Sequence, residues 1–406
     1  MHLFWIILLV LLCTFAVLML LVVLTWRNEL RTMASLHQVD GNPFLYVMEY
    51  KTHYDLDHLV EQDASGYMDL LNYSVMRFLK FFKFRFFLSG LGEARTPQRV
   101  NCTSFQAARA DGTGFLFGRN YDYYKNPTLV TISRPKKGYA SIAVCDMSFM
   151  GYNTRHLPIP FIQRVNSLIS IYEPLDGINE KGFCASIHAL PQRFASQQQT
   201  SRHAVGTSTL LRLMLDRCAT VEEAIALVRT VDVRHDPQVN VGFQYILADA
   251  EGNCAVLAFD PDNNWETMVT RKAKGSDHMQ VTNHILDPKY YSATPDPSVG
   301  NTESLSWQRY NTADSYLTER NGRITLPQAQ ECLSLVRITD LPITDGIAMG
   351  TQYQLSFKHL LPVLETVHDS LYEDTQYSNI YDQRNIVLSL RNWNDYDVTH
   401  TFSLKK

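Results

Sequence analysis

The sequence predicts an α+β domain over residues 102–406, preceded by one apolar helix at the N-terminus. From residue 102 onward, short apolar runs alternate with Gly- and Asn-containing turns, which is typical of strands joined by hairpins. Three helical patterns interrupt these strands, and no internal repeat or low-complexity linker divides the region. The 406 residues are 45% hydrophobic and 19% charged, so the chain can form a large core.

The apolar helix comprises residues 3–26, LFWIILLVLLCTFAVLMLLVVLTW, and contains no charged residue. A helix of about 20 apolar residues crosses the hydrocarbon core of a bilayer. The run is longer than the apolar part of an ordinary signal peptide, and no small-x-small cleavage site follows it. We therefore expect residues 1–26 to be a transmembrane anchor or an uncleaved signal, with residues 3–26 in the membrane. Arg27 and Arg31 follow the run, and by the positive-inside rule they favour a cytoplasmic C-terminus.

Residues 27–101 are mixed in character. The stretch FLYVMEY (residues 44–50) alternates as a strand does, and LDHLVEQ (residues 56–62) predicts a short helix. Residues 67–88 are apolar with four basic residues among them. This pattern fits a helix on a membrane surface and equally a helix packed on the neighbouring domain, and the sequence leaves both open.

Local signals predict the elements of the domain. Hairpin turns are expected at three places: Asp111–Gly112, Asn179–Gly182 and Glu251–Asn253. Residues 207–231 predict two helices separated near Ala219, the second of which opens with a capping box formed by Thr220 and Glu223. A further helix is expected at residues 326–338, and residues 375–393 return to strands.

Composition excludes several classes of function. The net charge is −4 and no Lys- or Arg-rich run is present, so nucleic-acid binding is not expected. The seven cysteines form no CxxC pair and the histidines form no HExxH motif, so neither a metal nor a cofactor is expected. Cys13 lies in the apolar helix, and five of the other six cysteines have the apolar flanks of buried free thiols.

The remaining cysteine, Cys102, lies in a hairpin. When strands are paired outward from Asp111–Gly112, position 102 falls opposite about position 121, so Arg119 and Asp122 return beside the thiol. Strand alternation places Arg119 and Asp122 on opposite faces, and we expect one of them to leave the ladder at a bulge or at the strand end. An ordinary edge hairpin with a surface ion pair would show the same pattern.

Several ordered motifs then agree with one family. They are CTS (102–104), GRNYD (118–122), DGINEKGF (176–183), the two helices of residues 207–231, YILADAEGNCAV (245–256), VTN (281–283), SWQRY (306–310) and TQYSNIYD (375–382). Together they resemble the choloylglycine hydrolase family of bile salt hydrolases, penicillin V acylases and related linear-amide hydrolases. Acid ceramidase and N-acylethanolamine acid amidase are more distant relatives with a similar opening. The resemblance covers residues 102–406, and residues 44–100 resemble the pro-segment of anchored or secreted members.

The resemblance implies an N-terminal-nucleophile hydrolase with a four-layer αββα sandwich. Such enzymes cut their own chain, so cleavage after Asn101 would separate a pro-segment (residues 27–101) from the catalytic domain (residues 102–406). Cys102 would then carry a free α-amine with a pKa of about 8, able to take the proton of a thiol with a pKa of about 8.5.

The resemblance also implies roles for other residues. Arg119 would favour the thiolate, and Asp122 would hold the α-ammonium. Asn179 and Asn283 match positions that stabilise the tetrahedral oxyanion, for which neutral amide donors are suited. Arg309 matches an arginine that organises the surroundings of the nucleophile.

The expected function is therefore hydrolysis of a small linear N-acyl amide, such as a bile salt, penicillin V or an N-acyl amino acid, through an acyl-thioester on Cys102. Alternatives are an N-acyltransferase of the same superfamily, a ceramidase-like lipid amidase, and a non-catalytic membrane-tethered binding protein. The loops MSFMGYN (147–153) and RHLPIPF (155–161) are candidates for an acyl pocket or for surface aromatics. The resemblance favours an extracytoplasmic catalytic domain, which is the opposite of the orientation that Arg27 and Arg31 favour. Whether the chain forms a homo-oligomer is left open.

Overall fold

The computed structural model describes residues 2–66, 69–70, 72–74, 77, 101–155, 157–236, 239, 241–291, 301–339, 341–342 and 372–405.

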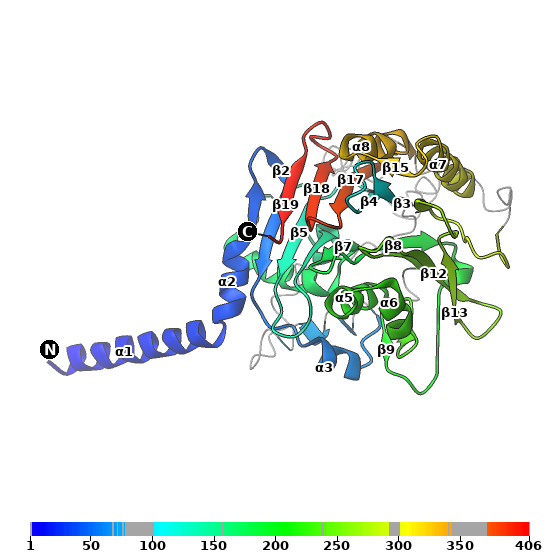
Figure 1. Ribbon diagram of the computed structural model, residues 1–406. Coiled ribbons are helices and arrows are strands. Elements are labelled where there is room, and N and C mark those ends of the chain that lie inside the picture. Colours follow the sequence, from blue (N-terminus) through cyan, green and yellow to red (C-terminus); the bar gives the residue numbers. More distant parts are fainter. Residues whose placement is uncertain are drawn as a thin grey trace, which may run out of the picture.

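The centre of the molecule consists of two β-sheets that lie face to face (Figure 1). The first sheet has nine strands in the order β1-β2-β5-β6-β7-β8-β11-β12-β13. These are β1 (His37–Val39), β2 (Asn42–Tyr50), β5 (Thr128–Ser133), β6 (Ser141–Asp146), β7 (Asp176–Asn179), β8 (Cys184–Leu190), β11 (Gly242–Ala248), β12 (Cys254–Asp260) and β13 (Glu266–Arg271).

The second sheet has the order β14-β3-β4-β17-β18-β19, with β15 beside β3 and β16 beside β17. Its strands are β14 (His278–Val281), β3 (Asn101–Arg109), β4 (Phe115–Tyr123), β17 (Tyr372–Asp382), β18 (Val387–Asn392), β19 (His400–Ser403), β15 (Arg323–Ile324) and β16 (Leu341–Pro342). A separate short pair consists of β9 (Ala204–Val205) and β10 (Asp232–Val233).

Helices cover the outer faces of both sheets. On the first sheet, α5 (Thr207–Arg217) packs against β7 and β8, and α6 (Val221–Val228) packs against β11 and β12. On the second sheet, α7 (Asn301–Thr318) contacts β3 and β14, and α8 (Leu326–Leu335) contacts β4 and β17. The predicted four-layer αββα arrangement is therefore confirmed.

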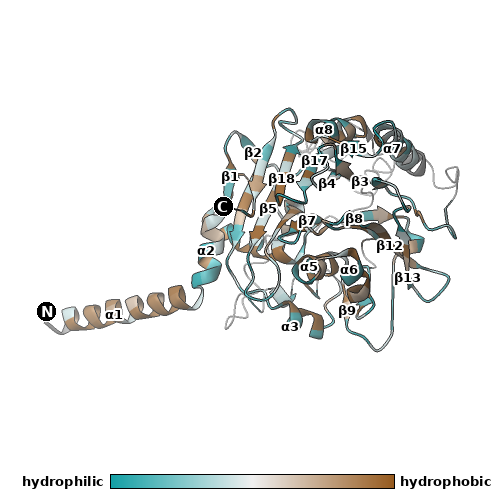
Figure 2. Cartoon of the chain, in the orientation of Figure 1, coloured by the Kyte–Doolittle hydropathy of each residue, from teal (hydrophilic) through white to brown (hydrophobic). Residues whose placement is uncertain are grey.

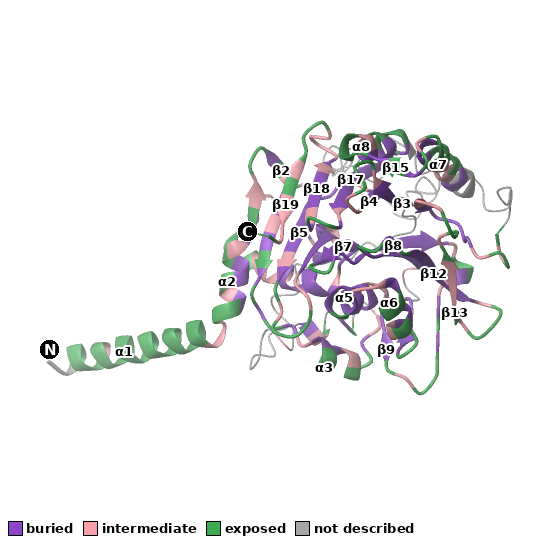
Figure 3. Cartoon of the chain, in the orientation of Figure 1, coloured by how far each residue is buried: buried purple, intermediate pink, exposed green. Residues whose placement is uncertain are grey.

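The core is divided among the layers, as the buried strands in Figure 3 show. One cluster lies under α5 and α6, and another lies between the second sheet and helices α7 and α8. The cluster between the sheets combines Val144 and Ile246 of the first sheet with Phe117 and Tyr377 of the second. Cys102 belongs to this middle cluster, so the nucleophile predicted from the sequence lies between the two sheets.

Most of the elements predicted within the domain are present. The first hairpin joins β3 to β4, and Gly112 in its turn has a φ of 72°, which only glycine adopts without strain. The other two hairpins, the pair α5 and α6, the helix α8 and the C-terminal strands lie where they were expected. Thr220 caps α6 by accepting the N–H of Glu223, whereas the Glu223 carboxylate binds the N–H of Ala219 instead of that of Thr220.

The residues before Cys102 belong partly to the first sheet. The predicted strand at 44–50 is β2, which pairs in parallel with β5, and β1 forms its other neighbour. The predicted short helix is α3 (Leu56–Glu61), and α2 (Arg27–Ser35) packs on the 3₁₀ segment η3 (Phe161–Tyr172). The first sheet thus contains strands from both sides of the predicted cleavage point, Asn101–Cys102. Most of the predicted helix at residues 67–88 lies outside the described residues.

The apolar helix α1 (His2–Thr25) extends away from the sandwich (Figures 1 and 2). Within it, residues 4–25 have a mean hydropathy of 3.4, and none of this span is buried against the protein. The helix is thus long and apolar enough to cross a membrane, as a membrane anchor or a signal sequence would be.

Candidate active site

Cys102 is the second residue of β3, and the pairing of β3 with β4 determines its neighbours. Cys102 lies opposite Tyr121, Asn101 opposite Asp122, and Ser104 opposite Arg119. The predicted register of the hairpin is therefore confirmed. It follows from the turn, because the length of a hairpin loop sets the pairing of every later residue.

Arg119 and Asp122 both stay in the ladder, so the expectation that one of them leaves it was wrong. Arg119 points toward the first sheet, where it contacts Asp176 of β7. Asp122 points to the other face, where it contacts Arg309 of α7. The two side chains reach Cys102 from opposite sides: Arg119 meets the thiol, and Asp122 lies near the main chain.

The thiol of Cys102 is buried and bonded to a guanidinium. Arg119 Nη2 donates to Cys102 Sγ at 3.4 Å, and the residue is 1% exposed. Burial raises the pKa of Cys102 to about 11, against the opposing effect of the Arg119 charge. In the uncut chain the thiol is therefore protonated at neutral pH, and an adjacent base is required to activate it.

Asp176 holds Arg119 in position. Its Oδ2 accepts Arg119 Nε at 2.9 Å and Tyr377 Oη at 2.6 Å, while its Oδ1 accepts Asn379 Nδ2 at 2.7 Å and the hydroxyl of Tyr381. A buried carboxylate with four donors is fully satisfied, so it can orient the guanidinium. Sequence reasoning missed Asp176, although it is the first residue of the DGINEKGF motif.

A second group missed by sequence reasoning is a polar cluster of Ser104, Ser186 and His188. Arg119 Nη1 lies 3.3 Å from His188 Nε2, which is also 2.9 Å from Ser104 Oγ and 3.1 Å from Ser186 Oγ. Since a guanidinium only donates, Nε2 is the acceptor and the imidazole is neutral. Burial, followed by the charges of Arg119 and Arg309, holds the pKa of His188 well below its usual range. Only the fold brings these three residues from two strands together.

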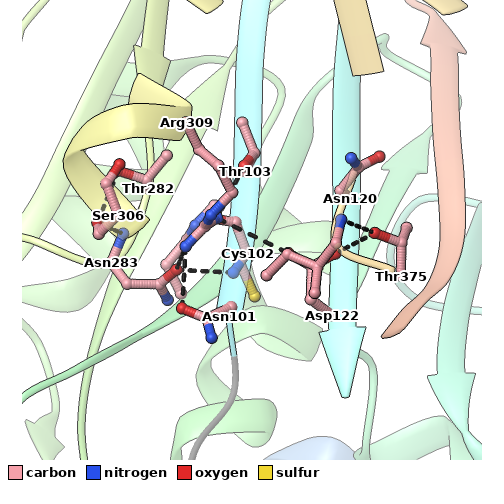
Figure 4. A network of polar contacts seen from close by, with 12 residues as sticks. Asn101, Cys102, Thr103, Asn120, Asp122, Thr282, Asn283, Ser306, Arg309 and Thr375 are labelled. Carbon is pink, nitrogen blue, oxygen red and sulfur yellow. Dashed lines mark hydrogen bonds and ion pairs between the residues drawn. The ribbon is translucent and has the colours of Figure 1, made fainter. Parts of the chain in front are cut away.

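Arg309 and Asn283 hold the main chain of Cys102 (Figure 4). Arg309 Nη1 donates to the Cys102 carbonyl at 2.7 Å and to Thr103 Oγ1 at 2.9 Å. Arg309 Nη2 donates to Asn101 Oδ1 and to Asn283 Oδ1, each at 2.9 Å. Asn283 Oδ1 also accepts the N–H of Cys102 at 2.7 Å. Both predicted residues therefore lie at the nucleophile.

Asp122 has one satisfied oxygen and one without a hydrogen bond. Oδ1 accepts Thr375 Oγ1 at 2.5 Å, whereas Oδ2 has no hydrogen bond within the described chain and lies 3.7 Å from Arg309 Nη1. Burial raises the pKa of Asp122 to about 6, against the Arg309 charge and the Thr375 hydrogen bond. Its partner across the ladder is Asn101, the residue that cleavage would detach.

Asn179 does not belong to this arrangement, and its predicted role as an oxyanion donor does not fit the structure. Its Nδ2 donates to the carbonyls of Leu215 at 3.0 Å and Cys218 at 2.7 Å, at the end of α5. Its Oδ1 accepts the N–H groups of Lys181 and Phe183 in the β7–β8 turn. Both amide hydrogens are thus used to bind a helix end to a hairpin, which leaves none for an oxyanion.

The aromatic loops considered for an acyl pocket are mostly core. Met147, Met150, Tyr152 and Ile159 are buried in the cluster that also lies under α5 and α6. Phe149 is partly buried and packs against the middle cluster that contains Cys102. The described part of the chain holds no group of three or more His, Cys, Asp or Glu residues suited to a metal ion.

Comparison with known proteins finds a family model and solved structures that are similar to parts of this chain. Residues 169–329 match the family model of acyl-coenzyme A:6-aminopenicillanic acid acyl-transferase. No relative was found among curated protein sequences. Two structures of the conjugated bile acid hydrolase of Clostridium perfringens are 13% and 12% identical, each with a TM-score of 0.49, and each alignment covers 75% of this chain and 92% of the other. Penicillin V acylase of Agrobacterium tumefaciens is 11% identical, with a TM-score of 0.38. This alignment covers 75% of this chain and 87% of the other.

The residues that the family model matches lie within residues 102–406, the region whose motifs resemble the choloylglycine hydrolase family. Over residues 169–329 the chain is therefore similar to this acyl-transferase family.

Proposed function

We propose that this protein is a cysteine-nucleophile amidohydrolase that cuts the C–N bond of small linear N-acyl amides, after cleaving its own Asn101–Cys102 bond. The observation that carries the proposal is the set of contacts around Cys102. Arg119 binds its thiol, Asn283 its amide nitrogen and Arg309 its carbonyl. A structural cysteine in a core needs none of these polar contacts.

The α-amine exposed by cleavage acts as the base in each turnover. It takes the proton of Cys102 Sγ, and the thiolate attacks the substrate carbonyl to form a C–S bond. The resulting ammonium returns its proton to the leaving nitrogen, and the C–N bond breaks. Water then attacks the thioester while the amine accepts its proton, which releases the acid and regenerates the thiol.

The contacts seen in the uncut chain suit this sequence of steps. Asn283 Oδ1 already accepts the N–H of the nitrogen that becomes the α-amine. Asp122 Oδ2 has no hydrogen bond within the described chain and lies 3.7 Å from Arg309 Nη1. Arg119 lies against the sulfur and favours its anionic form. Asn283 Nδ2, which donates to the Ala189 carbonyl at 2.9 Å in the uncut chain, is our proposed donor to the oxyanion.

Acyl transfer is the second candidate, because the matching family model is that of an acyltransferase. The two reactions share the thioester and differ in whether water or an amine takes the acyl group. Adding an amine acceptor to the processed enzyme distinguishes them. Amide formation at the expense of free acid would indicate transfer.

The test of the proposed function combines mass and activity. The wild-type protein should separate into residues 1–101 and a chain with Cys102 as its N-terminal residue, and this form should hydrolyse members of a panel of N-acyl amides. Cys102→Ala should keep the full mass and be inactive, because both steps need the sulfur. An active protein still joined at Asn101–Cys102 would contradict the mechanism, and an uncut, inactive wild type would support the tethered binding protein.

A further inference from the structure

The peptide bond between Asn101 and Cys102 is held on both sides by one guanidinium. Arg309 contacts the Cys102 carbonyl through Nη1 and the Asn101 side-chain oxygen through Nη2 (Figure 4). Asn283 Oδ1 binds the amide N–H of the same peptide bond and receives Arg309 Nη2 as well. We call these three residues, Asn101, Asn283 and Arg309, the clamp.

Asn101 differs from Asn283 and Arg309 in the fragment to which it belongs after cleavage. Its side chain is 2% exposed, so it lies inside the site rather than in solvent. Cleavage leaves Asn101 as the C-terminal residue of the first fragment, whereas Arg309 and Asn283 stay with the nucleophile. A contact made by Asn101 can therefore serve the cutting of the chain and cannot be required for later turnovers.

We propose that Asn101 is a positioning residue for self-cleavage, whose side-chain carbonyl is held by Arg309 so that the scissile peptide group stays against the Cys102 thiol. This inference rests on the proposed self-cleavage. It adds a residue on the N-terminal side of the cut that affects the rate of cleavage. An intramolecular attack depends on a narrow range of geometry, because small displacements of the reacting atoms are costly. A charge-assisted hydrogen bond to a buried side chain is a suitable restraint.

The step balances without any added group. Cys102 Sγ attacks the Asn101 carbonyl carbon, the C–S bond forms and the C–N bond breaks. The thiol proton passes to the leaving nitrogen, which becomes the α-amine of Cys102. Water then cleaves the thioester, which gives the Asn101 carboxyl group and restores the thiol. Because the buried thiol is protonated in the uncut chain, the proton that the nitrogen requires is present from the start.

The first experiment measures maturation of the full-length chain over time in cell-free translation with detergent. Asn101→Ala removes the acceptor and should slow cleavage about 10- to 100-fold, the effect of losing a hydrogen bond to a charged group. Asn101→Asp keeps an oxygen for Arg309 and should restore most of the rate. Asn120→Ala is the matched control, because Asn120 is fully buried on the adjacent strand and contacts Leu333 and Ser378 instead of the clamp.

The second measurement is turnover per mole of cleaved enzyme, with N-acyl amide as substrate. Once cut, Asn101→Ala should match the wild type in kcat and KM, whereas Arg309→Lys should impair both cleavage and turnover. This separation is the signature of a residue that acts only before the cut. If Asn101→Ala instead stays uncut altogether, still unfolds with wild-type cooperativity, and Asn101→Asp is cut, this result would also support the proposal.

Several outcomes would overturn it. Cleavage of Asn101→Ala at the wild-type rate, equal slowing by Asn120→Ala, or reduced turnover of the cleaved Asn101→Ala enzyme would each remove the proposed role. A first fragment lighter by one water would show that Asn101 cyclised through its own side-chain nitrogen, so that it reacts rather than positions. A wild type that is never cut would instead refute the proposed function itself.

Discussion

At the scale of single residues, the uncut site contains two buried ionisable groups, the carboxylate of Asp122 and the thiol of Cys102. Asp122 is buried with one oxygen outside any described hydrogen bond, and the Cys102 thiol is protonated. A new α-amino group beside Asn283 would act as a base for the thiol in its neutral form and as a counter-ion for Asp122 in its protonated form. The uncut and cut forms should therefore respond in opposite ways to loss of the Asp122 charge.

We expect Asp122→Asn to stabilise the uncut protein more at high pH than at low pH. The folded pKa of Asp122, about 6, lies above the unfolded value of about 3.9. The folded state therefore binds this proton more tightly, and stability is lost as pH rises from about 4 through 6. Denaturant unfolding of Cys102→Ala, with and without Asp122→Asn, should show a difference on the order of 1–3 kcal/mol at about pH 8 that shrinks at about pH 4.5. An equal difference at both pH values would contradict this.

Asn283 should matter for turnover, whereas Asn179 should matter for stability. Asn283→Ala should lower kcat about 100- to 1000-fold with little change in KM, because an oxyanion exists only in the transition state. Asn179→Ala is the comparison, since it leaves the carbonyls of Leu215 and Cys218 without a donor and should cost about 1–3 kcal/mol of unfolding free energy. Steady-state kinetics and thermal unfolding of the processed variants distinguish the two roles. A kcat unaffected by Asn283→Ala would remove it as an oxyanion donor.

At the scale of elements, the strands before Cys102 are bound to the domain by many contacts. Residues Leu45 to Tyr50 of β2 pair with β5, and Leu45 and Met48 are fully buried. Tyr50 Oη donates to the Leu168 carbonyl at 2.8 Å, and Tyr54 Oη donates to Asp216 at 2.7 Å. Arg164 Nη1 of η3 donates to the carbonyls of Met33 and Leu36, at the end of α2.

We therefore expect the first fragment to remain bound after cleavage. Removing β2 would expose one edge of β5 and uncover apolar side chains that each contribute roughly 1.5–3 kcal/mol. Affinity purification through a C-terminal tag should recover residues 1–101 with the mature chain in native buffer and lose them in denaturant. Leu45→Ala with Met48→Ala should weaken the complex, since each buried truncation costs about 2–5 kcal/mol. Loss of the fragment from the wild type in native buffer would contradict this expectation.

At the scale of the whole molecule, α1 and the sandwich have different surfaces. The large apolar side chains of α1 are exposed, among them Phe4, Trp5 and Phe15, each more than half exposed, while those of the sandwich lie mainly in its core (Figure 3). Such a helix is stable in a bilayer and would aggregate in water. We propose that α1 is a membrane anchor and that a bound first fragment would keep the cleaved protein at the membrane.

The protein should accordingly sediment with membranes and resist extraction by alkaline carbonate, both before and after cleavage. Deletion of residues 2–25 should move it to the supernatant. We also expect the sandwich to lie outside the cytoplasm, so a reporter active only in the cytoplasm and fused at the C-terminus should stay silent. Strong reporter signal would reverse this orientation and would agree with Arg27 and Arg31 instead.

The features that the sequence alone determined follow from local signals: turns, strand period, helix capping and hydropathy. A tight turn at Asp111–Gly112 and the two-residue period of strands place Cys102 opposite Tyr121, with Arg119 on the thiol side. Capping and apolar periodicity locate α6 and α8, and length with hydropathy identifies α1. Each of these features lies within one continuous segment of the chain, so no knowledge of distant segments is needed.

Only the tertiary structure decided which distant groups meet. Asp176 and His188 reach Arg119 from the opposing sheet, and Arg309 reaches both sides of the Asn101–Cys102 bond from α7. Asn179 resembles an oxyanion donor in its motif, yet the end of α5 takes both of its amide hydrogens. A side-chain amide donates to whichever acceptors the packing brings within about 3 Å, and residues far apart in the chain supply those acceptors. The pattern around an asparagine therefore cannot predict its partner.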